Sequence, residues 1–177
     1  MTTTTTAKLS AFHGKPEIKT EYLKRVQAHR AADQLVQGYG YWKDGKGCAV
    51  GCTIHSGEHA AYETKLGIPR VIARLEDGIF EGLPQAEARL WPERFLAAIP
   101  VGADLALVTP KFLHWLLVDA EQGVIRHART DEQRKAIQEV ADLFAKKIAG
   151  AKVSRAEWLK VREAAWAAAA AYAAAAA

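Results

Sequence analysis

The sequence predicts an all-α fold, an irregular bundle of about seven helices with a glycine-rich loop near residues 38–51. Apolar residues recur at steps of three and four through most of the chain, which is typical of amphipathic helices. Glycine and proline interrupt these stretches at the positions where helices begin or end. Sustained alternation of apolar and polar residues is missing, so the only sheet expected is a small ribbon near residues 39–43.

One helical domain is expected over residues 15–177, preceded by a disordered tail over residues 1–14. Residues 2–6 are a polar, low-complexity run of threonine that can bury nothing. The 177 residues, 50% of them hydrophobic and 25% charged, have an ordinary globular composition. A domain of this length can bury most of its apolar surface without a disulfide or a metal ion.

The first predicted helix starts at Pro16 and ends in the glycine-rich loop. Its apolar stripe is formed by Ile18, Tyr22, Val26, His29 and Val36. A second helix is predicted over residues 52–66, because Gly67 is a suitable C-terminal cap. Pro69 fits the first turn of a third helix, which Pro84 closes. The stripe of that helix is formed by Ile68, Ile72, Leu75, Ile79 and Leu83.

A short amphipathic helix is predicted between Trp91 and Pro100. Thr109 and Pro110 form a pair typical of the N-cap and first turn of a helix, which runs toward Gly123. Because this helix is apolar nearly all round, we expect it to be the buried centre of the bundle.

The last two helices each begin with a predicted capping box. Thr130 and Ser154 are each followed three residues later by Gln or Glu. The final helix, over residues 155–177, becomes nearly pure alanine, whose small side chains allow a close helix–helix contact within the chain or between copies of it. In a second interpretation, some of these alanines stand for side chains that are not identified. The uncharged run over residues 164–177 is shorter than the ~20 residues of a membrane span, so we expect no membrane anchor.

The chemically richest segment carries two cysteines and two histidines at steps of four, three and four. These residues are Cys48, Cys52, His55 and His59. Thiolate and imidazole groups at such spacings suit a Zn²⁺ site. On a straight helix the first and last of them would lie roughly 16 Å apart, so a shared ion requires the helix to break. Glycines at positions 47 and 51 could permit that break.

Two other interpretations of this segment stay open. Free cysteine is often simply buried, and the histidines could be held by carboxylates. Alternatively, Cys52 at a helix N-terminus, with His55 one turn later, could be a reactive or catalytic thiol for which Cys48 is the resolving partner. The candidate orienting groups are His29, Asp33, Glu58 and Glu63. A further candidate for metal or acid–base chemistry is Glu76, which clusters with two other carboxylates, Asp77 and Glu81.

The net charge of +4 is unevenly distributed along the chain. Basic residues exceed acidic ones over residues 1–47 and 126–162, and acidic residues exceed basic ones between them over residues 52–100. Such asymmetry can attract nucleic acid, but here charges of both signs alternate as on a solvated helix face. Only two cysteines and no signal peptide are present, which indicates a cytoplasmic location.

Residues 12–117, above all GKGCAVGCTIHSGEHAAYETKLGIP and RLEDGIFEGLP, resemble hypothetical proteins of bacteria and phages. No activity is known to us for those proteins, so the resemblance implies none.

Three hypotheses of function follow. The first is a cytoplasmic helical binding or scaffold protein, with Zn²⁺ held by Cys48, Cys52, His55 and His59, that self-associates through its alanine-rich C-terminal helix. The second is a thiol-dependent enzyme or redox sensor that uses Cys52 and His55. The third is a nucleic-acid-binding module. The sequence alone does not decide whether the protein is an enzyme.

Overall fold

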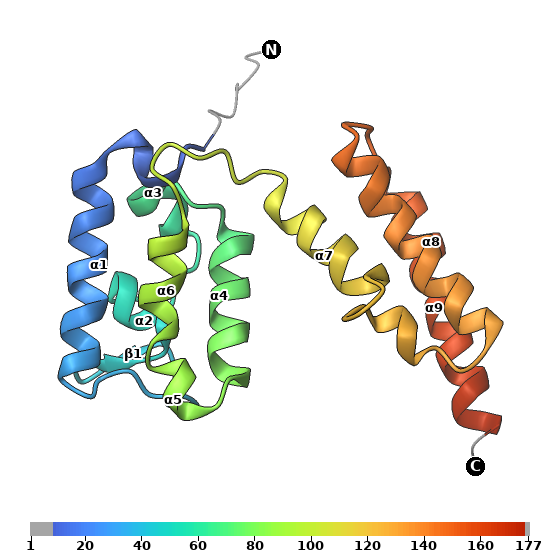
Figure 1. Ribbon diagram of the computed structural model, residues 1–177, viewed down its shortest axis with the longest axis horizontal. Coiled ribbons are helices and arrows are strands. Elements are labelled where there is room, and N and C mark those ends of the chain that lie inside the picture. Colours follow the sequence, from blue (N-terminus) through green and yellow to red (C-terminus); the bar gives the residue numbers. More distant parts are fainter. Residues whose placement is uncertain (1–8, 176–177) are drawn as a thin grey trace. The chain divides into compact units, whose positions relative to one another are not determined.

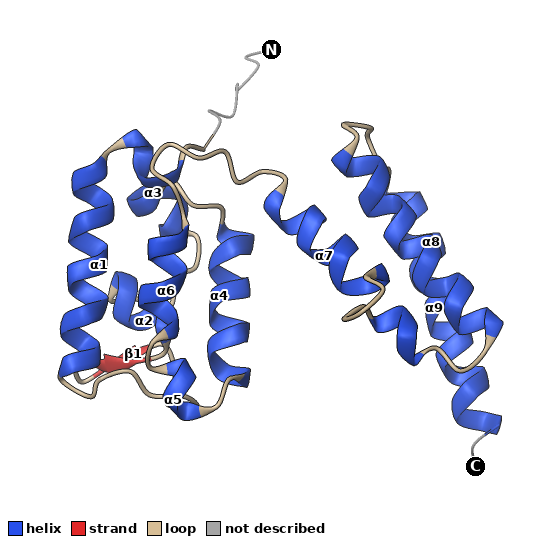
Figure 2. Cartoon of the chain, viewed as in Figure 1, coloured by secondary structure: helices blue, strands red, loops and turns tan. Residues whose placement is uncertain are grey.

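A computed structural model describes residues 9–175, and the chain is mostly helical, which confirms the all-α class (Figures 1 and 2). The sequence predicted one domain over residues 15–177, whereas the chain divides into two compact units, Met1–Ala106 and Leu107–Ala177. The helices of each unit bury apolar faces against one another, so each unit is described by itself. No helix among residues 9–175 combines the length and the apolar character needed to cross a membrane.

In the first unit a short central helix, α2, is surrounded by longer ones. Helices α1, α4 and α6 all contact α2 (Figure 1). The elements of this unit, in chain order, are η1 (Ala11–Gly14), α1 (Pro16–Ala31), β1 (Trp42–Lys43), β2 (Lys46–Gly47), α2 (Ala49–Ile54), α3 (Ala61–Leu66), α4 (Arg70–Gly82), α5 (Gln85–Ala88) and α6 (Trp91–Ala98).

Every residue of α2 is buried. Its glycine permits close packing, because a Cβ atom at Gly51 would lie 1.3 Å from the carbonyl oxygen of Tyr41. Gly47, just before the helix, faces the same oxygen, at 1.9 Å from its ideal Cβ position. The backbone at Tyr41 therefore crosses directly over α2, and this contact fixes the glycine-rich loop against the core.

The predicted helix over residues 52–66 is wrong as a single element. Helix α2 begins earlier, with Cys48 as its N-cap, and ends at His55, whose backbone is left-handed with φ 54° and ψ 42°. A residue in this conformation stops a helix. The chain resumes as α3 only at Ala61. The six residues between these helices therefore turn the histidines of this segment away from a common helix face.

The predicted ribbon is confirmed and lies slightly later than expected. Strands β1 and β2 pair antiparallel, with Trp42 opposite Gly47, and form the short sheet visible in Figure 2. Asp44 and Gly45 between them have φ of 50° and 76°. Positive φ at both positions is the geometry of a type I′ hairpin, for which an Asp-Gly pair is preferred.

The predicted disordered tail over residues 1–14 requires a correction for its last part. Residues 1–8 lie outside the described part of the chain. Phe12, in contrast, belongs to η1 and is fully buried among core side chains. The backbone N–H of Ala11 also donates a hydrogen bond to the carbonyl of Ala103, at 3.0 Å. Burial of an aromatic ring is strongly favourable, and this anchors the segment to the first unit.

The second unit consists of three longer helices and one short turn of helix. Its elements are α7 (Val108–Val118), η2 (Val124–His127), α8 (Asp131–Ile148) and α9 (Arg155–Ala175). Both predicted N-caps are confirmed, and at Ser154 the backbone N–H also donates to Glu157 Oε2 at 2.8 Å, which completes the capping box. The Thr130 hydroxyl accepts from the backbone N–H of Gln133 at 3.2 Å, and the Ser154 hydroxyl accepts from that of Glu157 at 3.2 Å.

Helix α7 is not the buried centre that its composition predicted. Within α7 only Pro110 is buried, and Trp115 and Leu116 are 44% and 36% exposed. Instead α8 is central in this unit and contacts both α7 and α9. The apolar stripe of α7 is wider than one partner helix can cover. Large side chains of α7 therefore remain at the surface.

Candidate functional site

Cys48 is held at the N-terminus of α2 by the backbone. Its Sγ atom accepts a hydrogen bond from the N–H of Gly51 at 3.5 Å, as the side chain of an N-cap residue does. The side chain is 2% exposed. Because the helix start fixes its backbone, the thiol points to a defined place between α2 and α4.

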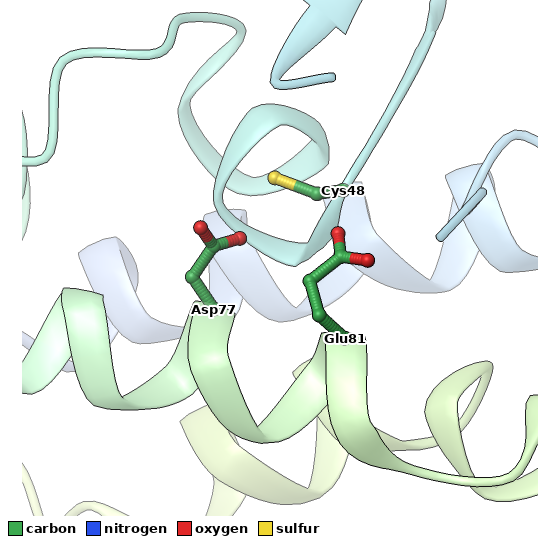
Figure 3. A group of neighbouring side chains, drawn as sticks. All are labelled: Cys48, Asp77 and Glu81. Carbon is green, nitrogen blue, oxygen red and sulfur yellow. The ribbon is translucent and has the colours of Figure 1, made fainter. Parts of the chain in front are cut away.

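Two carboxylates of α4 meet this thiol. Asp77 and Glu81 lie four residues apart, so they share one face of the helix, and both side chains extend toward Cys48 (Figure 3). The Cys48 Sγ atom and one oxygen of each carboxylate all lie within 4.8 Å of one another. Among the described residues, this is the one such group of three or more potential metal ligands.

The two carboxylates are fixed to different extents. Glu81 Oε2 accepts a hydrogen bond from the backbone N–H of Gly38 at 2.9 Å, so the glycine-rich loop orients this side chain. Asp77 Oδ2 lies 3.5 Å from His59 Nε2. The other oxygen, Asp77 Oδ1, is buried and has no hydrogen-bond partner among residues 9–175. A buried carboxylate oxygen without a partner is costly, and a bound cation would satisfy it.

His59 adds an imidazole at the edge of this group. It lies in the segment between α2 and α3, and the ring of Tyr41 packs edge-on against it with ring centroids 5.2 Å apart. Its contact with Asp77 resembles the carboxylate–histidine pairs that orient metal ligands. We refer to Cys48, His59, Asp77 and Glu81 together as the Cys48 cluster.

The Cys48 thiol is neutral near pH 7 in this environment. Burial, and after it the neighbouring Asp77 carboxylate, together raise its pKa to about 12. A bound divalent cation has the opposite effect on the pKa of the thiol, because a thiol that coordinates the ion loses its proton. The same surroundings therefore disfavour a free thiolate and provide negative charge for a cation.

Cys52 lies outside this group. Its thiol is fully buried and donates to the carbonyl oxygens of Gln34 and Gly47, each at 3.4 Å. Burial raises its pKa to about 12. A reactive thiol needs thiolate character and access to solvent, and Cys52 has neither.

His55 also lies apart from the Cys48 cluster. Its Nε2 atom is 2.8 Å from Nε2 of His29, and Nδ1 of His29 is 2.5 Å from Oε1 of Gln34. The indole of Trp42 stacks on the His55 ring, with centroids 4.3 Å apart and an interplanar angle of 18°. We refer to His29, Gln34, Trp42 and His55 as the histidine pair group. It brings together α1, the hairpin and the C-cap of α2.

A third polar group is buried inside the first unit. The Tyr62 hydroxyl donates to Glu76 Oε2 at 2.6 Å, and both side chains are 0% exposed. Desolvation raises the pKa of Glu76 to about 8. The carboxyl is therefore mostly protonated at neutral pH. Glu76 is not one of the three clustered ligand residues and is enclosed in the core.

The four residues that the sequence placed around one ion are thus divided between different surroundings. Cys48 and His59 belong to the Cys48 cluster, whereas Cys52 is enclosed by backbone carbonyls and His55 pairs with His29. Asp77 and Glu81 were recognised in the sequence only as neighbours of Glu76. Their spacing of four on a helix was the available signal, but their proximity to Cys48 depends on how α4 packs against α2.

Comparisons with protein-family models, with curated proteins and with solved structures found no significant match.

Proposed function

We propose that the protein is a helical binding or scaffold protein whose first unit holds a divalent metal ion, with zinc as the best-matched ion. The ligands we assign are Cys48, Asp77 and Glu81, with His59 as a fourth ligand or as the group that orients Asp77. The observation that carries this proposal is the approach of one thiol and two carboxylates to within 4.8 Å of one another.

The donor set suits zinc in chemical type. Zinc binds thiolate at ~2.3 Å and carboxylate oxygen or imidazole nitrogen at ~2.0–2.2 Å. Ligands at such distances in a tetrahedron lie ~3.5 Å apart, so the side chains need to move inward by about 1 Å at most. The exposed side chain of Glu81 has the freedom to do so.

The site would join segments that are distant in the sequence. Cys48 begins α2, Asp77 and Glu81 lie on α4, and Glu81 also receives the N–H of Gly38 from the glycine-rich loop. A bound ion would therefore hold the loop and both helices together. Its role in this proposal is structural, and binding would stabilise the folded chain by mass action.

The test is the metal content of the purified full-length protein after exposure to Zn²⁺ and removal of excess ion. We expect one equivalent of zinc in the wild type and a loss of most of it in Cys48→Ser, Asp77→Asn and Glu81→Gln. Glu58→Gln is the matched control, because Glu58 is an exposed carboxylate outside the cluster.

Two results would contradict the assignment. Zinc retained in Asp77→Asn and Glu81→Gln but lost in Cys52→Ser and His55→Asn would restore the ligand set predicted from the sequence. If the wild-type protein takes up no zinc, the proposed metal site is contradicted.

We also propose that the protein is cytoplasmic and self-associates through its second unit. Both cysteines are free thiols, as expected in a reducing compartment. In the second unit, large apolar side chains of α7 and α9 are exposed, among them Trp115 at 44% and Trp166 at 75%. Exposed apolar surface of this kind is typical of interaction sites. Sedimentation of the full chain over a range of concentrations tests this part.

A further inference from the structure

The second unit contains an apolar groove of about 330 Å³. Side chains from all four of its helical elements form the walls. Its apolar lining includes Leu117, Val124, Ile137, Val140, Ala165 and Ala169. Among the described residues, no lysine, arginine, aspartate or glutamate lines the groove, and the polar ones that do are His127 and Gln133.

This composition restricts the occupant. A charged side chain would lose its hydration in the groove and find no opposite charge there, which is costly. A suitable occupant is a large apolar group carried by an uncharged segment.

The same helix that lines the groove presents such a group. Trp166 follows Ala165 directly on α9, and its side chain is 75% exposed, more than any other large apolar side chain that the structure describes. The described part of α9 after Trp166 contains no charged residue. Tryptophan is the residue type most often found as an anchor at protein interfaces.

We propose that two copies of this chain dimerise by inserting Trp166 of each copy into the groove of the other. The inference rests on the self-association proposed above and names its contact. Because Trp166 and the alanines of the groove wall lie on one helix, a two-fold axis close to α9 allows both insertions at once, which gives a closed, symmetric contact. The alanines around Trp166 allow two α9 helices to approach closely.

The experiment compares the dimer dissociation constants of full-length variants by sedimentation equilibrium. Trp166→Ala is expected to weaken dimerisation at least tenfold, because it removes the anchor. Ala169→Glu, which introduces a carboxylate at an exposed position of the groove wall, is expected to have a similar effect. Leu107→Ala is the matched control, since Leu107 is also exposed but does not line the groove, and it should leave the constant within about twofold of the wild type.

The outcomes distinguish this inference from the broader proposal. A wild-type chain that is monomeric at all concentrations overturns both. A wild-type oligomer that persists unchanged in Trp166→Ala and Ala169→Glu keeps self-association and overturns the groove contact. An oligomer lost in Leu107→Ala but not in Trp166→Ala assigns the interface to the start of α7 and also overturns it.

Discussion

The Nε2 atoms of His29 and His55 face each other at 2.8 Å. With Gln34 accepting the Nδ1 proton of His29, the remaining nitrogen of His29 can accept the Nε2 proton of His55. Burial, the positive charge of Arg25 and the neighbouring His29 and Lys65 lower the pKa of His55, which favours the neutral ring that this arrangement needs.

Acidification is therefore expected to lower the unfolding free energy of the first unit through His55. The folded chain binds a proton at His55 less readily than the unfolded chain, so its stability falls as the pH decreases below about 6.5. Urea unfolding at pH 7 and pH 5 should show a smaller difference in unfolding free energy for His55→Asn than for the wild type. Asparagine tolerates the left-handed backbone of this position. His114→Asn should retain the wild-type difference, and an equal reduction in both variants would contradict the role of the pair.

The buried Glu76 carboxyl should give the opposite dependence on pH. Its pKa rises from 4.5 to about 8 on folding, so the unfolded chain loses this proton first. Stability attributable to Glu76 then decreases as the pH rises from 4.5 to about 8, by roughly 1.4 kcal/mol per pH unit at most. Glu76→Gln should remove this decrease and still accept from Tyr62. Unfolding free energies measured between pH 5 and pH 8 provide the check, and a wild-type slope in Glu76→Gln would refute the assignment.

Zinc affinity should increase with pH, because the Cys48 thiol must lose its proton to coordinate the ion. Its pKa of about 12 means that one proton is released on binding throughout the neutral range. Competition with a chelator of known pH dependence should show an affinity increase approaching tenfold per pH unit between pH 6.5 and 8. Cys48→Ser should bind more weakly and with a flatter dependence. An unchanged slope in this variant would mean that another group releases the proton.

Both thiols should react slowly with alkylating reagents in the folded protein. Cys48 and Cys52 are buried, and the pKa of each is raised to about 12. Mass spectrometry after a timed exposure to iodoacetamide should find both unmodified in native protein and modified in urea. Fast native alkylation of Cys52 would instead support the thiol enzyme or redox sensor predicted as an alternative from the sequence.

Gly51 should not tolerate a side chain. Gly51→Ala places a methyl group 1.3 Å from the Tyr41 carbonyl oxygen, so the backbone must move, and we expect a loss of about 2 kcal/mol or more in unfolding free energy. Gly78→Ala on α4 is the matched control, because among the described residues no atom beyond its own stretch of helix lies within 4 Å of its added Cβ. Alanine in a helix interior should stabilise that site by roughly 0.5–1 kcal/mol. Equal effects in the two variants would show that the crossing at Tyr41 is not rigid.

The sequence predicted those features of the fold that depend on residues close together in the chain. The N-caps at Thr130 and Ser154 depend on groups three residues apart, and both are confirmed. The end of α2 was missed because a histidine, not a glycine, adopts the left-handed conformation there. The sequence pattern continued through this point and indicated one long helix.

Contacts between segments that are distant in the sequence were harder to predict. Cys48 meets Asp77 and Glu81 only because α2 and α4 pack together, and no periodicity in either segment encodes that packing. Helix α7 is a second case in which packing could not be predicted from the sequence of one segment. Its apolar composition predicted burial, but the chain gives it too few neighbours within its unit to cover Trp115.

The complete enclosure of α2 has a consequence for how the first unit opens. A helix of six residues is too short to persist alone in water, so α2 exists only while its neighbours surround it. Its amide protons can then exchange with solvent only when the surrounding helices separate. In a hydrogen-exchange experiment they should be the slowest of the unit, and their rate would report the free energy of its global unfolding.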